Sequence, residues 1–228
     1  MAEPVFLITG ASSGIGAATA RLAAAQGYRV VLAARRAEEI ARLADELGGP
    51  ARATAIPTDV SEWSANETLV RHALDTFGRL DVVLANAGFG AKQGWLEDTP
   101  ERWRAMVLTN VLGAAYTMRA AIPAVIETRG HLVITGSVGG RRVRPGSFYS
   151  CTKWSNTAMG EAIRQDLHGT GVRVTVIEPG TVDTEFFETP RQDALLADDV
   201  ARAVMYAVSQ PPHVDVNEVM VRSVSQAS

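Results

Sequence analysis

The residues best suited to acid–base chemistry lie in the second half of the chain. Tyr149 and Lys153 are four positions apart, so they share one face of a helix. A free tyrosine hydroxyl has a pKa of about 10, and a neighbouring cation such as Lys153 stabilises its phenolate. Ser137 can hold a substrate oxygen and the charge that develops on it, and Asn110 can keep a water for a proton relay. Together these residues predict proton transfer at a carbonyl or alcohol group.

A glycine-rich segment near the N-terminus has the composition of a phosphate-binding turn. Its glycines are at positions 10, 14 and 16 of Thr9-Gly10-Ala11-Ser12-Ser13-Gly14-Ile15-Gly16. Between a strand and a helix, such glycines let the backbone approach a pyrophosphate at the helix N-terminus. The spacing differs from the Gly-x-Gly-x-x-Gly fingerprint, and a turn built only for close packing is the alternative. The flanking strand and helix and the downstream Ser137, Tyr149 and Lys153 favour dinucleotide binding.

The residues that follow the second predicted strand bear on the choice of cofactor. A carboxylate there would bind the 2′-hydroxyl of an adenosine ribose and repel a 2′-phosphate. The chain has Arg35 and Arg36 instead, and its next acidic residue is Glu38. An arginine fork suits a phosphate, and Ser13 can donate a second hydrogen bond. The sequence therefore predicts NADP(H), with Arg35 favoured over Arg36, which is more readily interpreted as a solvated residue at a helix start.

Strands that alternate with longer helical segments position these residues. The predicted strands are Val5–Thr9, Val30–Ala34, Ala51–Pro57, Leu80–Ala85, His131–Thr135, Val172–Ile177 and Val214–Val221. The predicted helices are Gly16–Gln26, Ala37–Leu47, a segment capped by Ser61 and ending near Phe77, Pro100–Glu127, Phe148–His168 and Ala197–Val208. This alternation indicates a single domain over residues 1–228, an α/β doubly wound fold with a mainly parallel seven-stranded sheet. Ligands should bind at the carboxyl ends of the strands.

Composition excludes several classes of protein. The 228 residues are 46% hydrophobic and 21% charged with a net charge of −3, so neither disorder nor nucleic-acid binding is expected. Cys151 is the only cysteine, which fits a reducing compartment, and its role stays open between packing and a reactive thiol. The sequence contains no run of about 18 apolar residues and no secretory signal, so neither a membrane span nor export is expected. The four histidines lack metal-ligand spacing, so no metal site is expected. The single cysteine and the lack of a membrane span or export signal predict a cytoplasmic protein.

From end to end the chain resembles the short-chain dehydrogenase/reductase family, and it departs at Trp154 and in the short segment 186–197. The matching segments are the glycine loop, Asp59-Val60, Asn86-Ala87-Gly88, Asn110, Ser137, Tyr149-Ser150-Cys151-Thr152-Lys153 and Pro179-Gly180-Thr181-Val182. The resemblance implies a Rossmann fold and a catalytic tetrad of Asn110, Ser137, Tyr149 and Lys153. It also implies that Asp59 meets the adenine, Asn86 stabilises its strand, Val182 presents its backbone to the carboxamide and Thr184 bonds a phosphate. The cofactor-binding residues expected in this way are Gly10, Ser12, Ser13, Gly14, Ile15, Gly16, Arg35, Arg36, Asp59, Val60, Asn86, Ala87, Gly88, Tyr149, Lys153, Pro179, Gly180, Val182 and Thr184.

The expected activity is hydride transfer between NADPH and a carbonyl or alcohol, in a homodimer or homotetramer. The tail 216–222 is similar to a subgroup that acts on small hydroxy acids or clavulanate-type aldehydes. Arg141, Arg142 and Arg144 follow the serine and suggest an anionic substrate, although solvated or ion-paired arginines are the alternative. Two other functions stay open. One is an NADPH-binding sensor without turnover, and the other is a sugar-nucleotide epimerase or dehydratase on the same scaffold.

Overall fold

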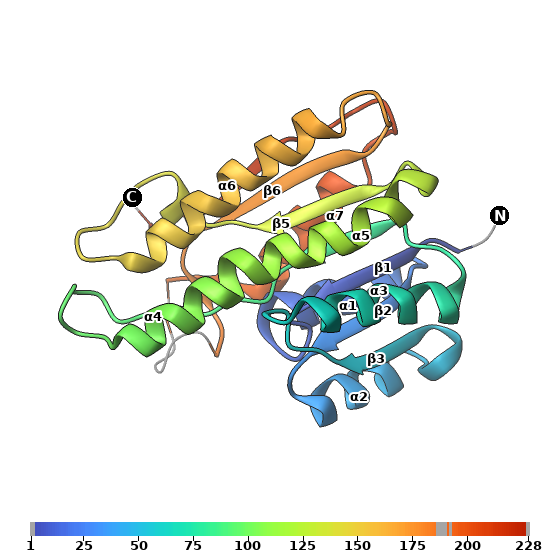
Figure 1. Ribbon diagram of the computed structural model, residues 1–228, viewed down its shortest axis with the longest axis horizontal. Helices are drawn as coiled ribbons and strands as arrows, with labels where there is room; N and C mark the ends of the chain where they lie inside the picture. The colour runs from blue at the N-terminus through green and yellow to red at the C-terminus, as the bar shows by residue number, and fades with distance from the viewer. Residues whose placement is uncertain (1–2, 186–190, 192, 227–228) are drawn as a thin grey trace.

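Seven parallel strands form the central sheet in the computed structural model, which describes residues 3–185, 191 and 193–226 (Figure 1). The strands are short aliphatic runs, and the central ones are buried throughout because helices cover both faces of the sheet. In chain order they are β1 (Val5–Thr9), β2 (Arg29–Ala34), β3 (Ala53–Pro57), β4 (Val82–Ala85), β5 (His131–Thr135), β6 (Arg173–Pro179) and β9 (Glu218–Val221).

The order of the strands confirms the predicted doubly wound fold. It is β3-β2-β1-β4-β5-β6-β9, and every neighbouring pair is parallel. The chain starts in the middle of the sheet, builds outward to β3, and returns to add β4 on the other side of β1. In open sheets of this kind, the crevice at that reversal, outside the carboxyl ends of the strands, is where ligands bind.

Helices form a layer on each face of the sheet. One buried cluster joins α1, α2 and α7 to the sheet through Ala17, Ile40 and Val200. The other joins α3 and α5 to the opposite face through Leu69 and Met118, and α6 packs on the same side. The helices are α1 (Gly14–Ala25), α2 (Ala37–Glu46), α3 (Trp63–Phe77), α4 (Pro100–Val107), α5 (Ala114–Thr128), α6 (Phe148–Asp166) and α7 (Ala197–Val208), with 3-10 turns at Gly49–Ala51 and Val138–Gly140.

The long helix predicted over Pro100–Glu127 is continuous but changes its winding. A π-helical turn, Leu108–Gly113, separates α4 from α5 and contains Asn110. Such turns are rare and are frequently found at functional sites. The run Pro100–Thr128 also meets the length and composition criteria of a membrane span, as core helices of soluble proteins do, and 39% of its most apolar window is buried.

Three further details differ from the sequence-based expectation. Ser61 does not cap α3, which begins at Trp63 after Glu62; the Ser61 hydroxyl instead donates to Asp59 Oδ1 at 2.7 Å. The last strand starts at Glu218 rather than Val214. A separate parallel pair, β7 (Val182–Asp183) with β8 (Leu195–Leu196), was not predicted, because two-residue strands leave no periodic pattern in a sequence.

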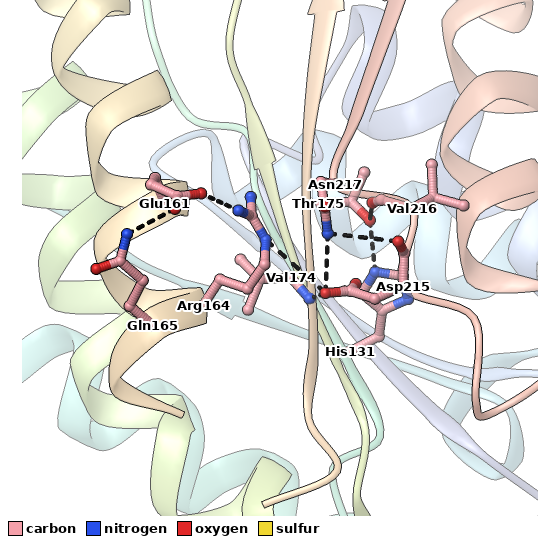
Figure 2. A network of polar contacts seen from close by, with 9 residues as sticks. All are labelled: His131, Glu161, Arg164, Gln165, Val174, Thr175, Asp215, Val216 and Asn217. Atoms are coloured by element: carbon pink, nitrogen blue, oxygen red, sulfur yellow. Dashed lines mark hydrogen bonds and ion pairs between the residues drawn. The ribbon is translucent and has the colours of Figure 1, made fainter. Parts of the chain in front are cut away.

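Polar contacts fix the segment that precedes β9 to the sheet and to α6 (Figure 2). The Asp215 carboxylate accepts the backbone N–H of Val174 at 3.0 Å and lies 3.8 Å from the Arg164 guanidinium. Thr175 Oγ1 donates to the Val216 carbonyl and lies 2.7 Å from Nε2 of the buried His131. These bonds satisfy polar groups inside the fold and hold the start of β9 against the amino ends of β5 and β6, at the end of the sheet opposite to the ligand crevice.

Candidate active site

A cavity of about 1160 Å³ lies at the carboxyl ends of β1, β2, β4, β5 and β6. It is the crevice expected from the reversal of strand order. Three of the sequence-predicted site residues do not line it, namely Gly14, Gly16 and Asn110. The others do: Gly10, Ser12, Ser13, Ile15, Arg35, Arg36, Asp59, Val60, Asn86, Ala87, Gly88, Ser137, Tyr149, Lys153, Pro179, Gly180, Val182 and Thr184.

The glycine loop is packed so closely that side chains are excluded at positions 10 and 16. Gly10 has φ +65°, and a Cβ there would lie 2.9 Å from Ala87 Cα. A Cβ on Gly16 would collide with the Gly10 carbonyl oxygen. These glycines therefore let the turn pack tightly and place the N-terminus of α1 at the cavity, which is the arrangement that a pyrophosphate requires. Gly14 and Gly16 shape this turn without lining the cavity.

Hydrogen bonds hold this loop against the end of β4. Asn86 Nδ2 donates to the carbonyls of Thr9 and Gly10 at 3.2 and 3.3 Å. Its Oδ1 accepts the Thr135 hydroxyl at 3.1 Å, which ties β5 into the same group. Asn86 follows β4, and its side-chain amide thus links the ends of β1 and β5 to it at the floor of the cavity.

Ser137, Tyr149 and Lys153 converge on the cavity from two elements. Ser137 follows β5 and caps the 3-10 turn, accepting the Gly139 N–H at 3.0 Å, while the other two project from the first turns of α6. The Ser137 hydroxyl is hydrogen-bonded to the Tyr149 phenol. Lys153 is 4% exposed, and its Nζ donates to the Thr135 carbonyl at 2.7 Å and lies 5.7 Å from the Tyr149 ring centroid.

Burial shifts the pKa of both α6 residues toward the neutral form. It raises the pKa of Tyr149 to about 12, although the Ser137 hydrogen bond and the positive charge of Arg144 act in the opposite direction. It lowers the pKa of Lys153 to about 8. At neutral pH the phenol therefore keeps its proton, and the ammonium remains mostly charged. This is the protonation state needed to donate a proton to an alkoxide.

Asn110 lies behind this group, in the π-helical turn. Its Nδ2 donates to the Phe89 carbonyl at 2.9 Å and to Thr152 Oγ1 at 3.2 Å, and its Oδ1 accepts the Phe89 N–H at 3.0 Å. The side chain is buried, and it fixes the segment after β4 against α6. Asn110 therefore connects the two halves of the cavity wall.

The other end of the cavity carries the two arginines that follow β2. Arg36 donates from Nη2 to Ser13 Oγ at 2.7 Å and from Nε to Ser12 Oγ at 3.2 Å. The pKa of the Asp59 carboxyl group is lowered. Burial acts against this shift, but hydrogen bonds from Ser61 and the positive charge of Arg35 favour the carboxylate form. The structure thus directs Arg36, the less favoured of the two in the sequence argument, toward the glycine loop.

The arginines after Ser137 separate into different environments. Arg141 forms a salt bridge with the buried Glu178 at 2.7 Å and pairs with Glu218, so it contributes to the wall of the fold. Arg144 lines the cavity together with Lys92 and Arg102, whereas Arg142 is exposed outside it. The short segment 186–197, expected to leave the mouth open, lies partly outside the described residues.

Comparison with known proteins identifies the family. A model of the family described as short chain dehydrogenase matches residues 4–195. An uncharacterized oxidoreductase of Staphylococcus aureus (strain USA300) is 37% identical over 229 residues, covering 98% of this chain and 99% of that one. The chain belongs to the short-chain dehydrogenase family. It is accordingly an oxidoreductase of that family with a Rossmann-type fold.

Solved structures of other short-chain dehydrogenases agree with this assignment. An alcohol dehydrogenase from Thermococcus sibiricus, complexed with 5-hydroxy-NADP, is 33% identical with a TM-score of 0.90, covering 99% of this chain and 98% of that one. A 3-ketoacyl-(acyl-carrier-protein) reductase from Brucella melitensis, complexed with NADH, is 29% identical with a TM-score of 0.90, covering 98% of both chains. Nicotinamide dinucleotides are thus bound by proteins that share this fold over nearly their whole length.

Two residues that line the cavity of this short-chain dehydrogenase, Thr135 and Glu185, were not predicted as site residues from the sequence. Thr135 lines the cavity, and its carbonyl accepts both Lys153 Nζ and Asn156 Nδ2. Its place two residues before Ser137, at the end of a predicted strand, was the only available signal. Glu185 also lines the cavity, beside Arg36. It was missed because a carboxylate was sought only after the second strand.

Proposed function

We propose that the protein is an NADP(H)-dependent oxidoreductase that interconverts a carbonyl and an alcohol. The observation that carries the proposal is the convergence of Ser137, Tyr149 and Lys153 on a cavity whose opposite end is a glycine loop flanked by arginines. A bound nicotinamide would supply or accept the hydride. The protein would bind and orient the substrate, exclude water and manage the proton.

The catalytic roles follow from the contacts of each side chain. Ser137 and Tyr149 would donate hydrogen bonds to the substrate oxygen and polarise the carbonyl. The Tyr149 proton would then pass to the alkoxide as it forms, which the raised pKa of this phenol permits at neutral pH. Lys153, anchored on the Thr135 carbonyl, would stabilise the phenolate that remains and donate to a ribose hydroxyl. Asn110 would position the Phe89 segment, because its amide is engaged there.

The remaining expected contacts supply the cofactor site. Gly10 and the turn through Gly16 would hold the pyrophosphate, while Asp59 and Val60 would border the adenine. Val182 and Thr184 would meet the nicotinamide carboxamide and a phosphate. The chain is proposed to act as one domain, 1–228, in the cytoplasm and as a homodimer or homotetramer. Trp154 and Leu112, which are 43% and 36% exposed on α6 and the π-helical turn, support such an interface.

The preference for NADPH is supported by the two arginines after β2. A charge-assisted hydrogen bond contributes roughly 1.5–3 kcal/mol, or about 10- to 150-fold in affinity. The test is NADPH and NADH oxidation against a panel of ketones and aldehydes, with Arg35→Ala and Arg36→Ala measured separately. Arg36→Ala should lower the NADPH preference more. Equal kcat/KM for the two cofactors in the unmodified enzyme would refute the preference, and binding of NADPH without any turnover would favour a sensor.

An anionic substrate is supported by Arg144, Lys92 and Arg102 around the cavity. Arginine and lysine recognise carboxylates and phosphates, as in an oxo-acid or a carrier-linked acyl chain. Matched ketones with and without a carboxylate should differ in kcat/KM, and the advantage of the anion should shrink in high salt and in Arg144→Ala. Arg142→Ala is the control, because Arg142 does not line the cavity. A neutral ketone that is reduced faster at every ionic strength would exclude this substrate class.

A further inference from the structure

Glu185 pairs with Arg36 at the arginine end of the cavity, where the phosphate of NADP(H) is proposed to bind. Its Oε2 lies 2.9 Å from Arg36 Nη2, and the same Nη2 lies 2.7 Å from Ser13 Oγ. Glu185 is also hydrogen-bonded to the Ser13 side chain. Both hydrogen bonds lower the pKa of this carboxyl group below its usual value, so it is an anion at neutral pH.

The backbone around Glu185 is fixed close to the glycine loop. Glu185 directly follows Thr184, and a Cβ on Gly14 would lie 3.2 Å from Thr184 Cγ2. The strand just before them, β7, pairs with β8, which leads directly into α7. Helix α7 packs on α1, the helix that the glycine loop begins. The packing of β7, β8 and α7 therefore positions the Glu185 carboxylate next to Ser13 and Arg36.

Two of these side chains, Arg36 and Ser13, are those proposed to receive a ribose 2′-phosphate. Arg36 and Ser13 are the donors that such a phosphate would use, and they, Glu185 and Arg35 all line the cavity. A carboxylate and a phosphate are both anions that accept hydrogen bonds from a guanidinium. The Glu185 carboxylate and a phosphate cannot accept the same N–H and O–H groups at the same time, and two neighbouring anions also repel each other.

We infer that Glu185 is an internal competitor for the 2′-phosphate site, and that it sets how strongly the enzyme distinguishes NADP(H) from NAD(H). This inference rests on the proposed NADP(H) specificity. The 2′-phosphate must displace the Glu185 carboxylate from Arg36 and Ser13, so part of its binding free energy is spent on that exchange. A cofactor with a free 2′-hydroxyl does not require the exchange, because a carboxylate accepts a hydrogen bond from a hydroxyl.

The expected size of the effect follows from the exposure of the ion pair. The Arg36 and Glu185 side chains are 48% and 66% exposed, so solvent screens their attraction. Exposed ion pairs of this kind typically change a binding constant by about 1.4- to fivefold. Glu185→Gln should therefore tighten 2′-phosphate binding by about 1.4- to fivefold and leave binding of an unphosphorylated ribose unchanged or slightly weaker.

Isothermal titration with two adenosine nucleotides measures this directly on the full chain, without turnover. Adenosine 2′,5′-bisphosphate carries the 2′-phosphate, and adenosine 5′-monophosphate lacks it. Glu67→Gln is the matched control, since it removes one exposed negative charge on α3, away from the cofactor cavity. In an Arg36→Gln background the gain from Glu185→Gln should shrink, because the competition requires Arg36.

The outcomes separate this inference from the proposed cofactor preference. A selective gain for the bisphosphate in Glu185→Gln, absent in Glu67→Gln, supports the competition. An unchanged bisphosphate Kd, or an equal gain in both variants, overturns it even if the unmodified enzyme prefers the bisphosphate. If the unmodified enzyme shows no preference and Glu185→Gln creates one, the competition stands and the proposed NADP(H) specificity fails.

Discussion

Replacing Arg141 with methionine should destabilise the fold by leaving a buried carboxylate without its cation. The Glu178 side chain is 1% exposed, and its Oε1 accepts Arg141 Nε at 2.7 Å and Thr157 Oγ1 at 3.2 Å. Without the guanidinium, only the threonine bond remains. Breaking a buried ion pair by removing one partner typically costs about 3–5 kcal/mol. We expect about 3 kcal/mol here, because the Arg141 side chain itself is 30% exposed.

The loss should appear in the melting temperature and should depend on pH. For a chain of this size, about 3 kcal/mol corresponds to a decrease of about 6–12 °C. Burial already raises the pKa of Glu178, and losing Arg141 should raise it further. A carboxyl whose pKa is higher in the folded state binds more protons there, so stability falls as pH rises above its unfolded pKa. The difference between Arg141→Met and the unmodified protein should therefore grow as pH rises above the folded-state pKa of Glu178 in the unmodified protein, which is itself raised.

Glu178→Gln provides the matched control for this reasoning. It removes the buried charge, keeps a hydrogen-bond acceptor for Thr157, and leaves Arg141 paired with Glu218. Its destabilisation should be clearly smaller than that of Arg141→Met and nearly independent of pH. Calorimetry of both variants between pH 4 and 8 decides the matter. Equal losses in the two variants, or a loss in Arg141→Met that does not change with pH, would refute the argument from a stranded carboxylate.

Four further predictions concern catalysis, stability and assembly. Tyr149→Phe should lower kcat by about 10²- to 10⁴-fold with nucleotide affinity unchanged in a titration, and a variant that retained more than about a tenth of kcat would exclude Tyr149 as the acid. Lys153→Ala should lose both turnover and nucleotide affinity, and in the unmodified enzyme kcat/KM for reduction should fall as pH rises through about 8, where Lys153 loses its proton. Burial lowers the pKa of His131 to about 3, so the neutral form is stabilised and stability is lost as pH falls below about 6.5; calorimetry should show a smaller acid-induced decrease in His131→Gln. Light scattering at micromolar concentration should give a dimer or tetramer that Trp154→Glu weakens, and a monomeric mass would contradict the proposed assembly.

The architecture could be predicted from the sequence because its signals are local. Each strand of the sheet lies within or next to an aliphatic run, and each glycine of the first loop stands between a strand and a helix. The four-residue spacing of Tyr149 and Lys153 fixes them on one face of α6 whatever the rest of the chain does. Strand order then follows from the preference for right-handed crossovers. These rules required no knowledge of contacts between distant residues.

The choice between Arg35 and Arg36 could not be made in this way. Arg35 and Arg36 both follow β2 and line the cavity, and it is Arg36 that donates to the serines of the glycine loop. Which one does so depends on where β2 stops and how α2 starts, and such boundaries are poorly defined by sequence. The contacts of Glu185 with Arg36 and of Arg141 with Glu178 were hidden for a related reason. Each joins residues that are 149 or 37 positions apart in the chain.

The protonation state of the site likewise depends on these distant contacts. From sequence, Lys153 is the cation expected to stabilise the Tyr149 phenolate. In the fold, the influences that lower the Tyr149 pKa are the Ser137 hydrogen bond and the charge of Arg144, while the Lys153 ammonium is directed at the Thr135 carbonyl. Burial outweighs both influences and keeps the phenol protonated at neutral pH, as the proposed donation of a proton to an alkoxide requires. Arg144 therefore links two properties of the enzyme, since the charge proposed to attract an anionic substrate also makes the neighbouring phenol a stronger acid.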